Sequence, residues 1–282
     1  MSAVDIDGLQ NWVGKTQTRC DVITAAPVAA LSATLDYAQP SALVGEALPV
    51  CWHWLYFQDA AAASSLAADG HPRRGGFLPP VAFPRRMWAG SRLRFTAPLK
   101  LGDEVQRRST LAQVRHKAGR SGELIIVTVQ HQVYRGDDLA IEEEQDLVYR
   151  EQGSGNIESV SRPAPAAVQW SREIQPDSVL LFRYSALTFN SHRIHYDRGY
   201  ATAEEGYASL VVQGPLTATL LLDLLHRELP GAGIAAFEFR ALKPLFEGMP
   251  IHLQGRRDEQ KVRLWALDAS GALAMDARAV LM

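Results

Sequence analysis

The sequence is poor in cysteine and has no long hydrophobic run. Cys20 and Cys51 are the only cysteines among 282 residues, too few for a disulfide framework, and their spacing does not suit a metal site. We therefore expect two unpaired thiols in a reducing compartment. The first twenty residues lack a basic segment followed by an apolar one, and no apolar stretch reaches the length of a membrane span. These absences predict a cytoplasmic protein.

An excess of charge of one sign is also missing. The 29 basic residues and 31 acidic residues give a net charge of -2, which argues against general binding to nucleic acid. An anionic substrate would have to meet a local cluster of arginines. Neither a G-x-S-x-G nucleophile elbow nor a phosphate-binding glycine-rich loop is present. The hydrophobic fraction of 47% indicates a globular protein with a substantial core.

A stretch rich in glycine, serine, proline and alanine divides the chain into two parts of ordinary domain size. This predicted linker covers residues 151–167, between an N-terminal unit at 1–150 and a C-terminal unit at 168–282. Both parts have the same pattern, in which a helix precedes several strands separated by turns. Because the sheet that follows an apolar helix normally wraps it, the pattern predicts two α+β units in tandem.

The N-terminal unit is predicted to hold a helix at 27–37, an aromatic β-rich run at 50–57 and a long loop at 58–87. Four strands follow, at 91–99, 104–117, 123–135 and 139–150. We interpret Trp52 and Trp54 as core residues, and residues 141–146, IEEEQD, as a solvated strand face. In the C-terminal unit a linking strand precedes a histidine-rich segment. An apolar helix follows at 215–229, and after it come four strands at 234–245, 250–258, 261–269 and 272–282.

The histidine-rich segment is the most informative part of the chain. It places four polar side chains within seven residues, at Asn190, His192, His195 and Tyr196. About twenty residues later, Gly214 and a proline open the apolar helix. Histidine transfers protons near neutral pH, and free N–H groups at a helix start stabilise an oxyanion. The two segments together indicate chemistry on an acyl group.

Four longer motifs carry a resemblance to a known family: WHWLYF at 52–57, DGHPRRGGFLPP at 69–80, PRRMWAG at 84–90 and FNSHRIHYD at 189–197. They resemble the R-specific enoyl-CoA hydratase (MaoC-like) family. The resemblance extends over nearly the whole chain to its subgroup of itaconyl-CoA and mesaconyl-C4-CoA hydratases, and to mitochondrial-type 3-hydroxyacyl-thioester dehydratases.

The resemblance implies a double hot-dog fold, with a sheet wrapped around a central helix in each unit. It also implies addition of water to a C5 dicarboxylyl-CoA, giving citramalyl-CoA, in a setting of itaconate degradation. No cofactor besides the CoA of the substrate is expected, and the chain is expected to form a homodimer. The N-terminal unit is expected to shape the acyl pocket and the C-terminal unit to carry catalysis.

The residue roles follow the family's motif position by position. His195 is the expected acid and base, Asn190 orients water, and the N–H of Gly214 polarises the thioester. Asn190 stands where the family has an aspartate, so it cannot act as a base. Phe189 stands in the place of the signature's glycine. The candidate substrate contacts are Arg85, Arg86, Trp88, His192, Arg193, Tyr196 and Gln213, and Arg193 is favoured for the distal carboxylate.

Three other functions remain open at this point. A dehydratase of fatty-acid synthesis would share fold and catalytic residues and differ at the end of the pocket. A hot-dog thioesterase generally uses a carboxylate, which Asn190 does not supply. A non-catalytic acyl-CoA-binding protein would follow from loss of that carboxylate. A metal site at His192 and His195 is disfavoured, because no third ligand lies nearby in the sequence.

Overall fold

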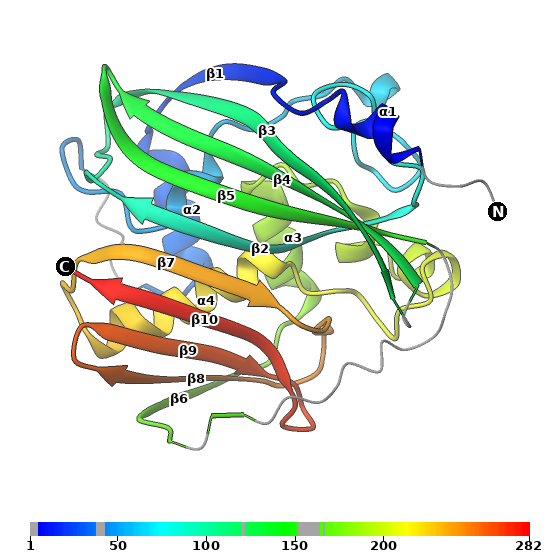
Figure 1. Ribbon diagram of the computed structural model, residues 1–282. Coiled ribbons are helices and arrows are strands. Elements are labelled where there is room, and N and C mark those ends of the chain that lie inside the picture. Colours follow the sequence, from blue (N-terminus) through cyan, green and yellow to red (C-terminus); the bar gives the residue numbers. More distant parts are fainter. Residues whose placement is uncertain (1–4, 38–42, 120–121, 152–163, 166) are drawn as a thin grey trace.

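The computed structural model describes residues 5–37, 43–119, 122–151, 164–165 and 167–282. The N-terminal part of the chain contributes β1 (Thr16–Val22), β2 (Arg85–Phe95), β3 (Glu104–Gly119), β4 (Gly122–Arg135) and β5 (Asp138–Arg150). The C-terminal part contributes β6 (Trp170–Ile174), β7 (Ile234–Ala241), β8 (Ile251–Asp258), β9 (Lys261–Leu267) and β10 (Leu273–Leu281). All ten join one antiparallel sheet in the order β1-β3-β4-β5-β2-β7-β10-β9-β8-β6 (Figure 1).

The strands predicted from alternating apolar and polar residues are confirmed, with ends that differ by a few residues. The largest difference is at β2, which begins at Arg85, inside the predicted long loop. The pairing of β2 with β5 shifts register between Trp88 and Gly90. A bulge of this kind interrupts the alternation that marks a strand in the sequence, so the first half of β2 did not show the pattern.

The two parts of the chain are joined where β2 pairs with β7. Leu93 lies opposite Phe237, and Gly90 lies opposite Arg240. A Cβ atom on Gly90 would come within 2.5 Å of the carbonyl oxygen of Phe239, so this position needs glycine for the strands to approach. The pairing removes an exposed strand edge from each part, and one continuous sheet results.

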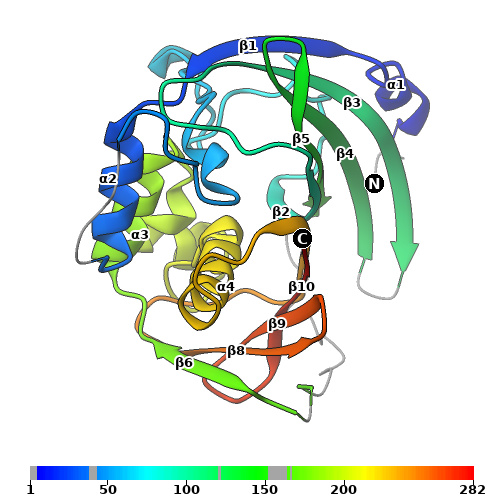
Figure 2. The same cartoon turned by 90° about the vertical axis from the view of Figure 1, so that its left-hand side faces the viewer.

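The helices gather on one face of this sheet. They are α1 (Ile6–Gln10), α2 (Ala25–Thr34), α3 (Ser178–Leu187) and α4 (Gly214–Glu228). Figure 2 shows the sheet curving around α2, α3 and α4. Ten consecutive residues of α4, Leu216 to Leu225, are buried, as expected for a helix surrounded by protein. Its predicted position at 215–229 is confirmed. None of the described helices is long and apolar enough to cross a membrane.

The order of elements repeats, but the central helix is present in only one part. In the C-terminal part α4 precedes β7, whereas in the N-terminal part the 3-10 turn η1 (Trp52–Leu55) and a long loop precede β2. The predicted helix at 27–37 forms as α2, but it packs beside α3. It is therefore the counterpart of α3, and the sheet of the N-terminal part has no full helix of its own at its centre among the described residues.

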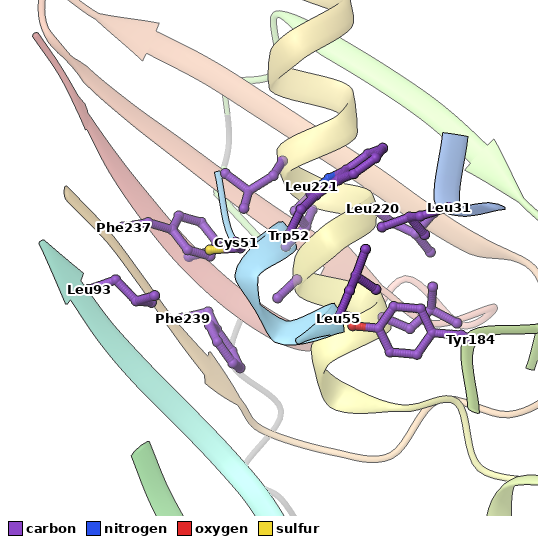
Figure 3. Close-up of a cluster of buried hydrophobic side chains, with 14 of the residues drawn as sticks. Leu31, Cys51, Trp52, Leu55, Leu93, Tyr184, Leu220, Leu221, Phe237 and Phe239 are labelled. Atoms are coloured by element: carbon purple, nitrogen blue, oxygen red, sulfur yellow. The ribbon is translucent and has the colours of Figure 1, made fainter. Parts of the chain in front are cut away.

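The aromatic run at 50–57 is not a strand, contrary to prediction. Cys51 and Phe57, which flank the turn, have φ angles of 67° and 56°, in the left-handed region that no strand adopts. Trp52 and Leu55 point into the core, together with residues of α4 and β7 (Figure 3). Aromatic and β-branched residues are favoured wherever side chains are buried from several sides, whether or not the backbone is extended. The composition of 50–57 was therefore mistaken for that of a strand.

Helix α3 was not predicted. Its buried residues Leu181, Tyr184 and Ser185 follow helical spacing, and the side chain of Asp177 caps it by accepting from the N–H of Leu180 at 2.8 Å. The helix ends directly before the histidine-rich segment and so sets its position. Most of the predicted linker at 151–167 lies outside the described residues, and the division into two domains stays a prediction.

Candidate active site

The histidine-rich segment turns sharply as it leaves α3. Phe189 has a φ of 49°, so it occupies the left-handed conformation that favours glycine, the residue which the family signature has at this position. The N–H of Asn190 donates to the carbonyl of Ser185 at 2.8 Å, and its Oδ1 accepts from the N–H of His192 at 3.1 Å. These bonds hold the short 3-10 turn η3 (Arg193–His195) in a fixed orientation.

His195 is held as a neutral imidazole with one free lone pair. It is buried, and its Nδ1 lies 2.7 Å from the carbonyl oxygen of Val211. A carbonyl only accepts, so Nδ1 carries the proton and Nε2 carries the lone pair. Burial and the positive potential of His192 lower the pKa of His195 to about 3, although the bond to Val211 opposes this. At neutral pH, His195 is thus ready to take a proton.

The start of α4 is tied to the histidine segment. The N–H of Val211 donates to the carbonyl of Ile194 at 2.9 Å, and His195 bonds back to Val211. Three residues further on, Gly214 begins α4, so its N–H has no acceptor within the helix, and Pro215 has none to offer. A Cβ on Gly214 would lie 3.3 Å from the carbonyl oxygen of Trp88. Hydrogen bonds therefore tie the segment of the predicted base to the chain three residues before the predicted oxyanion donor.

Gln213, the residue before this helix start, is fully buried. Its Nε2 donates to the carbonyl of Leu181 and to Oγ of Ser185, both at 2.9 Å, and so fastens α3 to α4. Its Oε1 has no hydrogen-bond partner among the residues that the structure describes. The amide therefore links the two helices through its nitrogen, and its oxygen remains able to accept a hydrogen bond. Its predicted contact with substrate stays a prediction.

A loop from the N-terminal part covers the catalytic segment. Arg193 donates its N–H to the carbonyl of Asp69 at 2.9 Å, and Oγ of Ser191 donates to the carbonyl of Gly70 at 2.5 Å. The ring of His71 lies 4.3 Å from the ring of His192, between centroids, and His192 lies 5.4 Å from His195. This loop is the motif at 69–80, and its contact with the site was not predicted from the sequence.

Two predicted substrate contacts are engaged within the protein. The guanidinium of Arg193 donates to Asp197 at 2.7 and 3.0 Å and lies over the ring of Tyr200 at 4.3 Å. Tyr196 is half-exposed, and its hydroxyl donates to the carbonyl of Ser191 at 3.1 Å. Arg193, the favoured receptor for a distal carboxylate, already has a carboxylate partner. Its role and that of Tyr196 in substrate binding stay predictions.

Arg85 is likewise engaged, whereas Arg86 is not. Arg85 donates to the backbone carbonyl of Glu205 and lies 3.8 Å from its carboxylate, which also lies 3.8 Å from Nε2 of His192. Arg86, one residue further along β2, makes no side-chain hydrogen bond or ion pair with any described residue. These two arginines therefore differ in what they can offer an incoming anion.

Glu143 lies near Trp88 and is buried, although it was predicted to face solvent. Glu143 is only 3% exposed and accepts from the indole of Trp54 at 3.1 Å, from Ser91 at 2.9 Å and from His53 at 3.1 Å. Trp88 in turn donates to Ser91 at 2.9 Å. The reading of 141–146 as a solvated face was wrong because three consecutive glutamates conceal the alternation of β5, in which the middle one points inward.

The charge of Glu143 is retained by its partners. Burial opposes ionisation, but hydrogen bonds from His53 and Gln145 and the positive potentials of His53 and His131 outweigh it and lower the pKa of Glu143 to about 2. The rings of Trp54 and Trp88 lie edge to face at 5.2 Å, and of the two only Trp54 donates to this carboxylate directly. Trp88 was predicted as a substrate contact, and its indole is held by Ser91, which in turn bonds to Glu143.

Gly70 offers a sharp test of the contact between loop and catalytic segment. Its φ is +87°, and a Cβ would come within 1.9 Å of the backbone oxygen of Ser191. We expect Gly70→Ala to destabilise the protein by roughly 2 kcal/mol and to lower kcat about tenfold, because the loop must move off His192. Urea unfolding and a steady-state assay measure both. Gly76→Ala, where a Cβ meets nothing within 4 Å, is the matched control, and equal behaviour of the two variants would contradict the argument.

Buried neutral histidines predict sensitivity to acid. Burial, with the charge of Arg107, lowers the pKa of His131 from 6.5 to about 4. The unfolded chain then binds more protons below pH 6.5, so stability present above pH 6.5 is lost as the pH falls toward 4. From pH 7.5 to 5.0 we expect this residue to account for about 2 kcal/mol of lost stability. Urea unfolding of wild type and His131→Gln at both pH values measures the difference, and identical pH dependence would contradict it.

The comparisons with known proteins agree with this geometry. Residues 51–247 match the model of the hydroxyacyl-thioester dehydratase type 2 family. The mesaconyl-C(4)-CoA hydratase of Chloroflexus aurantiacus is 45% identical over 94% of this chain and 95% of its own. The mitochondrial hydroxyacyl-thioester dehydratase type 2 of Schizosaccharomyces pombe is 30% identical over 83% of this chain and 87% of its own.

Among solved structures, a Mycobacterium tuberculosis protein with a double hotdog fold superposes with a TM-score of 0.59 at 15% identity, over 96% of each chain. The α+β double hot-dog fold expected from the sequence is thereby confirmed. The family model and the two relatives place the chain in the class of acyl-thioester hydratases and dehydratases. The chain is a member of the hydroxyacyl-thioester dehydratase type 2 family.

Proposed function

We propose that this protein adds water to the double bond of a C5 dicarboxylyl-CoA, mesaconyl-C4-CoA or itaconyl-CoA, giving citramalyl-CoA. The observation that carries the proposal is His195, whose Nδ1 is held by the carbonyl oxygen of Val211, three residues before Gly214, so that the lone pair of Nε2 stays available for a water proton. The likeness to a mesaconyl-C(4)-CoA hydratase over nearly the whole chain supports the substrate class.

The reaction needs one base and one oxyanion donor. For mesaconyl-C4-CoA, whose double bond is conjugated with the thioester, Nε2 of His195 takes a proton from water while the water oxygen bonds to the β-carbon. The double bond of itaconyl-CoA lies between the β- and γ-carbons and must first shift to the α,β position for the same steps. The electron pair of the double bond moves toward the thioester oxygen, where the N–H of Gly214 stabilises the developing charge. His195 then returns the proton to the α-carbon. The net result is the addition of H and OH across the double bond, and the imidazole is neutral again.

Asn190 has a supporting part in this scheme. Its Oδ1 is occupied by the N–H of His192, while its Nδ2 makes no hydrogen bond with any described residue. The amide can therefore donate to the water oxygen and turn a water proton toward His195. It orients the water and leaves the proton transfer to the imidazole, as expected for an amide in the place of a carboxylate.

The remaining expectations form part of the proposal. All proton transfer is assigned to His195, so the reaction is proposed to need no metal and no cofactor besides the CoA of its substrate. A cytoplasmic location agrees with a CoA thioester as substrate. A homodimer is proposed because hot-dog sheets often associate. The N-terminal part is proposed to shape the acyl pocket, which the approach of Trp88 and His71 to the catalytic segment supports.

A parallel assay tests the proposal. The purified protein meets mesaconyl-C4-CoA, itaconyl-CoA and crotonyl-CoA, and loss of enoyl-thioester absorbance is followed together with mass spectrometry for the gain of one water. We expect preference for a dicarboxylyl thioester. Preference for crotonyl-CoA would favour the dehydratase of fatty-acid metabolism, release of free thiol a thioesterase, and binding without turnover an acyl-CoA-binding protein; each of these outcomes would overturn the proposal.

A further inference from the structure

Arg86 carries a charge that nothing in the described protein neutralises. It lies half-buried near the start of β2, two residues before Trp88, so both side chains leave the same face of the strand. Trp88 packs on Trp54 and Phe239, on the face where the helices lie. No hydrogen bond or ion pair of the Arg86 guanidinium with a described residue is present. A half-buried guanidinium of this kind loses hydration without gaining a partner, unless a ligand supplies one.

Three other arginines near the catalytic segment are already engaged. Arg193 bonds to Asp197, and Arg85 bonds to Glu205. Arg74 donates to three backbone carbonyls of the loop that leads into β2, and lies over the ring of Tyr149 at 5.1 Å. Arg73 and Arg183 also lack a side-chain partner among the described residues, but both are exposed. Arg86 is the half-buried arginine of this region with capacity for an anion from outside.

Two ring contacts lead from His71 to the catalytic base. His71 lies tilted against His192, and His192 lies edge-on to His195, at ring distances of 4.3 and 5.4 Å. Burial is the main cause that lowers the pKa of His71, and the positive charge of Arg86 is the next. A guanidinium without a partner beside a buried, neutral imidazole is suited to an anion.

We infer that Arg86, with His71 beside it, receives the free carboxylate of the dicarboxylyl thioester. The inference rests on the proposed function and names the residues that select its substrate. In mesaconyl-C4-CoA the free carboxylate is bonded to the carbon that water attacks, so its receptor must adjoin the water held at His195. A guanidinium there also neutralises a charge that would otherwise repel the approaching water oxygen.

Crotonyl-CoA is the comparison probe, because it has a methyl group at the trans position of the β-carbon where mesaconyl-C4-CoA has its free carboxylate, and hydrogen in place of the cis methyl group. We expect Arg86→Met to lower kcat/KM for mesaconyl-C4-CoA by about 10- to 100-fold while crotonyl-CoA changes less than about threefold. Arg94→Met is the control, since Arg94 lies on the same strand with its side chain 74% exposed. Arg86→Lys keeps the positive charge but not the bidentate guanidinium. Its kcat/KM for mesaconyl-C4-CoA should therefore lie between those of the two methionine variants.

Equal losses on both thioesters would overturn the inference and assign Arg86 to the CoA portion that they share. An unchanged kcat/KM for mesaconyl-C4-CoA would overturn it as well. A wild type that hydrates only crotonyl-CoA would refute the proposed function instead, and that result is visible before any variant is made.

Binding of unreactive thioesters gives a readout that does not depend on turnover. Succinyl-CoA and butyryl-CoA are both saturated and differ by a carboxylate in place of a methyl group. By calorimetry we expect wild type to bind succinyl-CoA at least about tenfold more tightly, and Arg86→Met or Arg86→Lys to reduce this preference. If the Met variant does not fold, the Lys variant carries the test. A wild type without this preference, or a preference that both variants retain, would contradict the assignment.

Discussion

His195→Gln is expected to lower kcat for hydration about 1000-fold, with little change in KM. The imidazole acts through the lone pair on Nε2, which takes the water proton only as the transition state forms, so its loss affects kcat and not binding. Asn190 and the N–H of Gly214 remain in place but supply no base. Steady-state kinetics with mesaconyl-C4-CoA measure the loss, and circular dichroism verifies the fold.

The pH dependence gives a second view of the same residue. With a pKa near 3, His195 stays neutral in the free enzyme, so kcat/KM should remain level from pH 7.5 to 5.5, where an ordinary histidine would already be protonated. His116→Gln is the control, as His116 lies partly exposed on β3. Activity of the His195 variant above a tenth of wild type, or an acid limb near pH 6.5, would refute the assigned role.

Glu143→Ala is expected to lower the free energy of unfolding by about 3–5 kcal/mol, the range for breaking a buried charge pair. The change leaves donors of His53, Trp54 and Ser91 without their acceptor inside the protein. Because the folded pKa of about 2 lies below the ordinary 4.5, this contribution is present at pH 7 and is lost only as the pH falls from 4.5 to 2.

Urea unfolding at pH 7.5 measures this loss. The matched control is Glu144→Ala, one residue along the same strand, where the side chain is 47% exposed and pairs with Arg92. An exposed pair contributes about 0–1 kcal/mol. The free energy of unfolding of Glu143→Gln should lie between those of the two alanine variants, since the amide oxygen can still accept a hydrogen bond. Equal midpoints for the two alanine variants would show that the buried carboxylate does not hold the indoles of Trp54 and Trp88.

The parts of the fold that could be predicted are those with a local signal. Alternation marked strands such as β4 and β10, and the run of leucines after Gly214 marked α4. Segment 50–57 and β2 were misread because their backbone departs from the regular strand, through left-handed residues in one and a register shift in the other. Irregularities of this kind are set by packing against distant residues and leave no periodic trace.

The candidate site divides in the same way. His195, Asn190 and Gly214 stand in a recognisable motif, and their chemistry follows from the residue types alone. Asp69, Gly70 and His71 meet that motif from about 120 residues away, and no periodicity indicates such a contact. Glu143 was placed in solvent because a carboxylate is rarely buried unless it is paired, and its partners His53 and Ser91 come from other elements.

The amino-acid sequence was enough to identify the kinds of chemistry available: a histidine base, an amide for water, a glycine at a helix start, and two similar sets of strands. It was enough because proton affinity, backbone freedom and side-chain alternation belong to the residues and their near neighbours. The tertiary structure alone decided which charges are satisfied. Whether Arg86 is free while Arg193 is paired depends on atoms brought together across the fold, since electrostatic and hydrogen-bond energies depend on distance in space and not on separation along the chain.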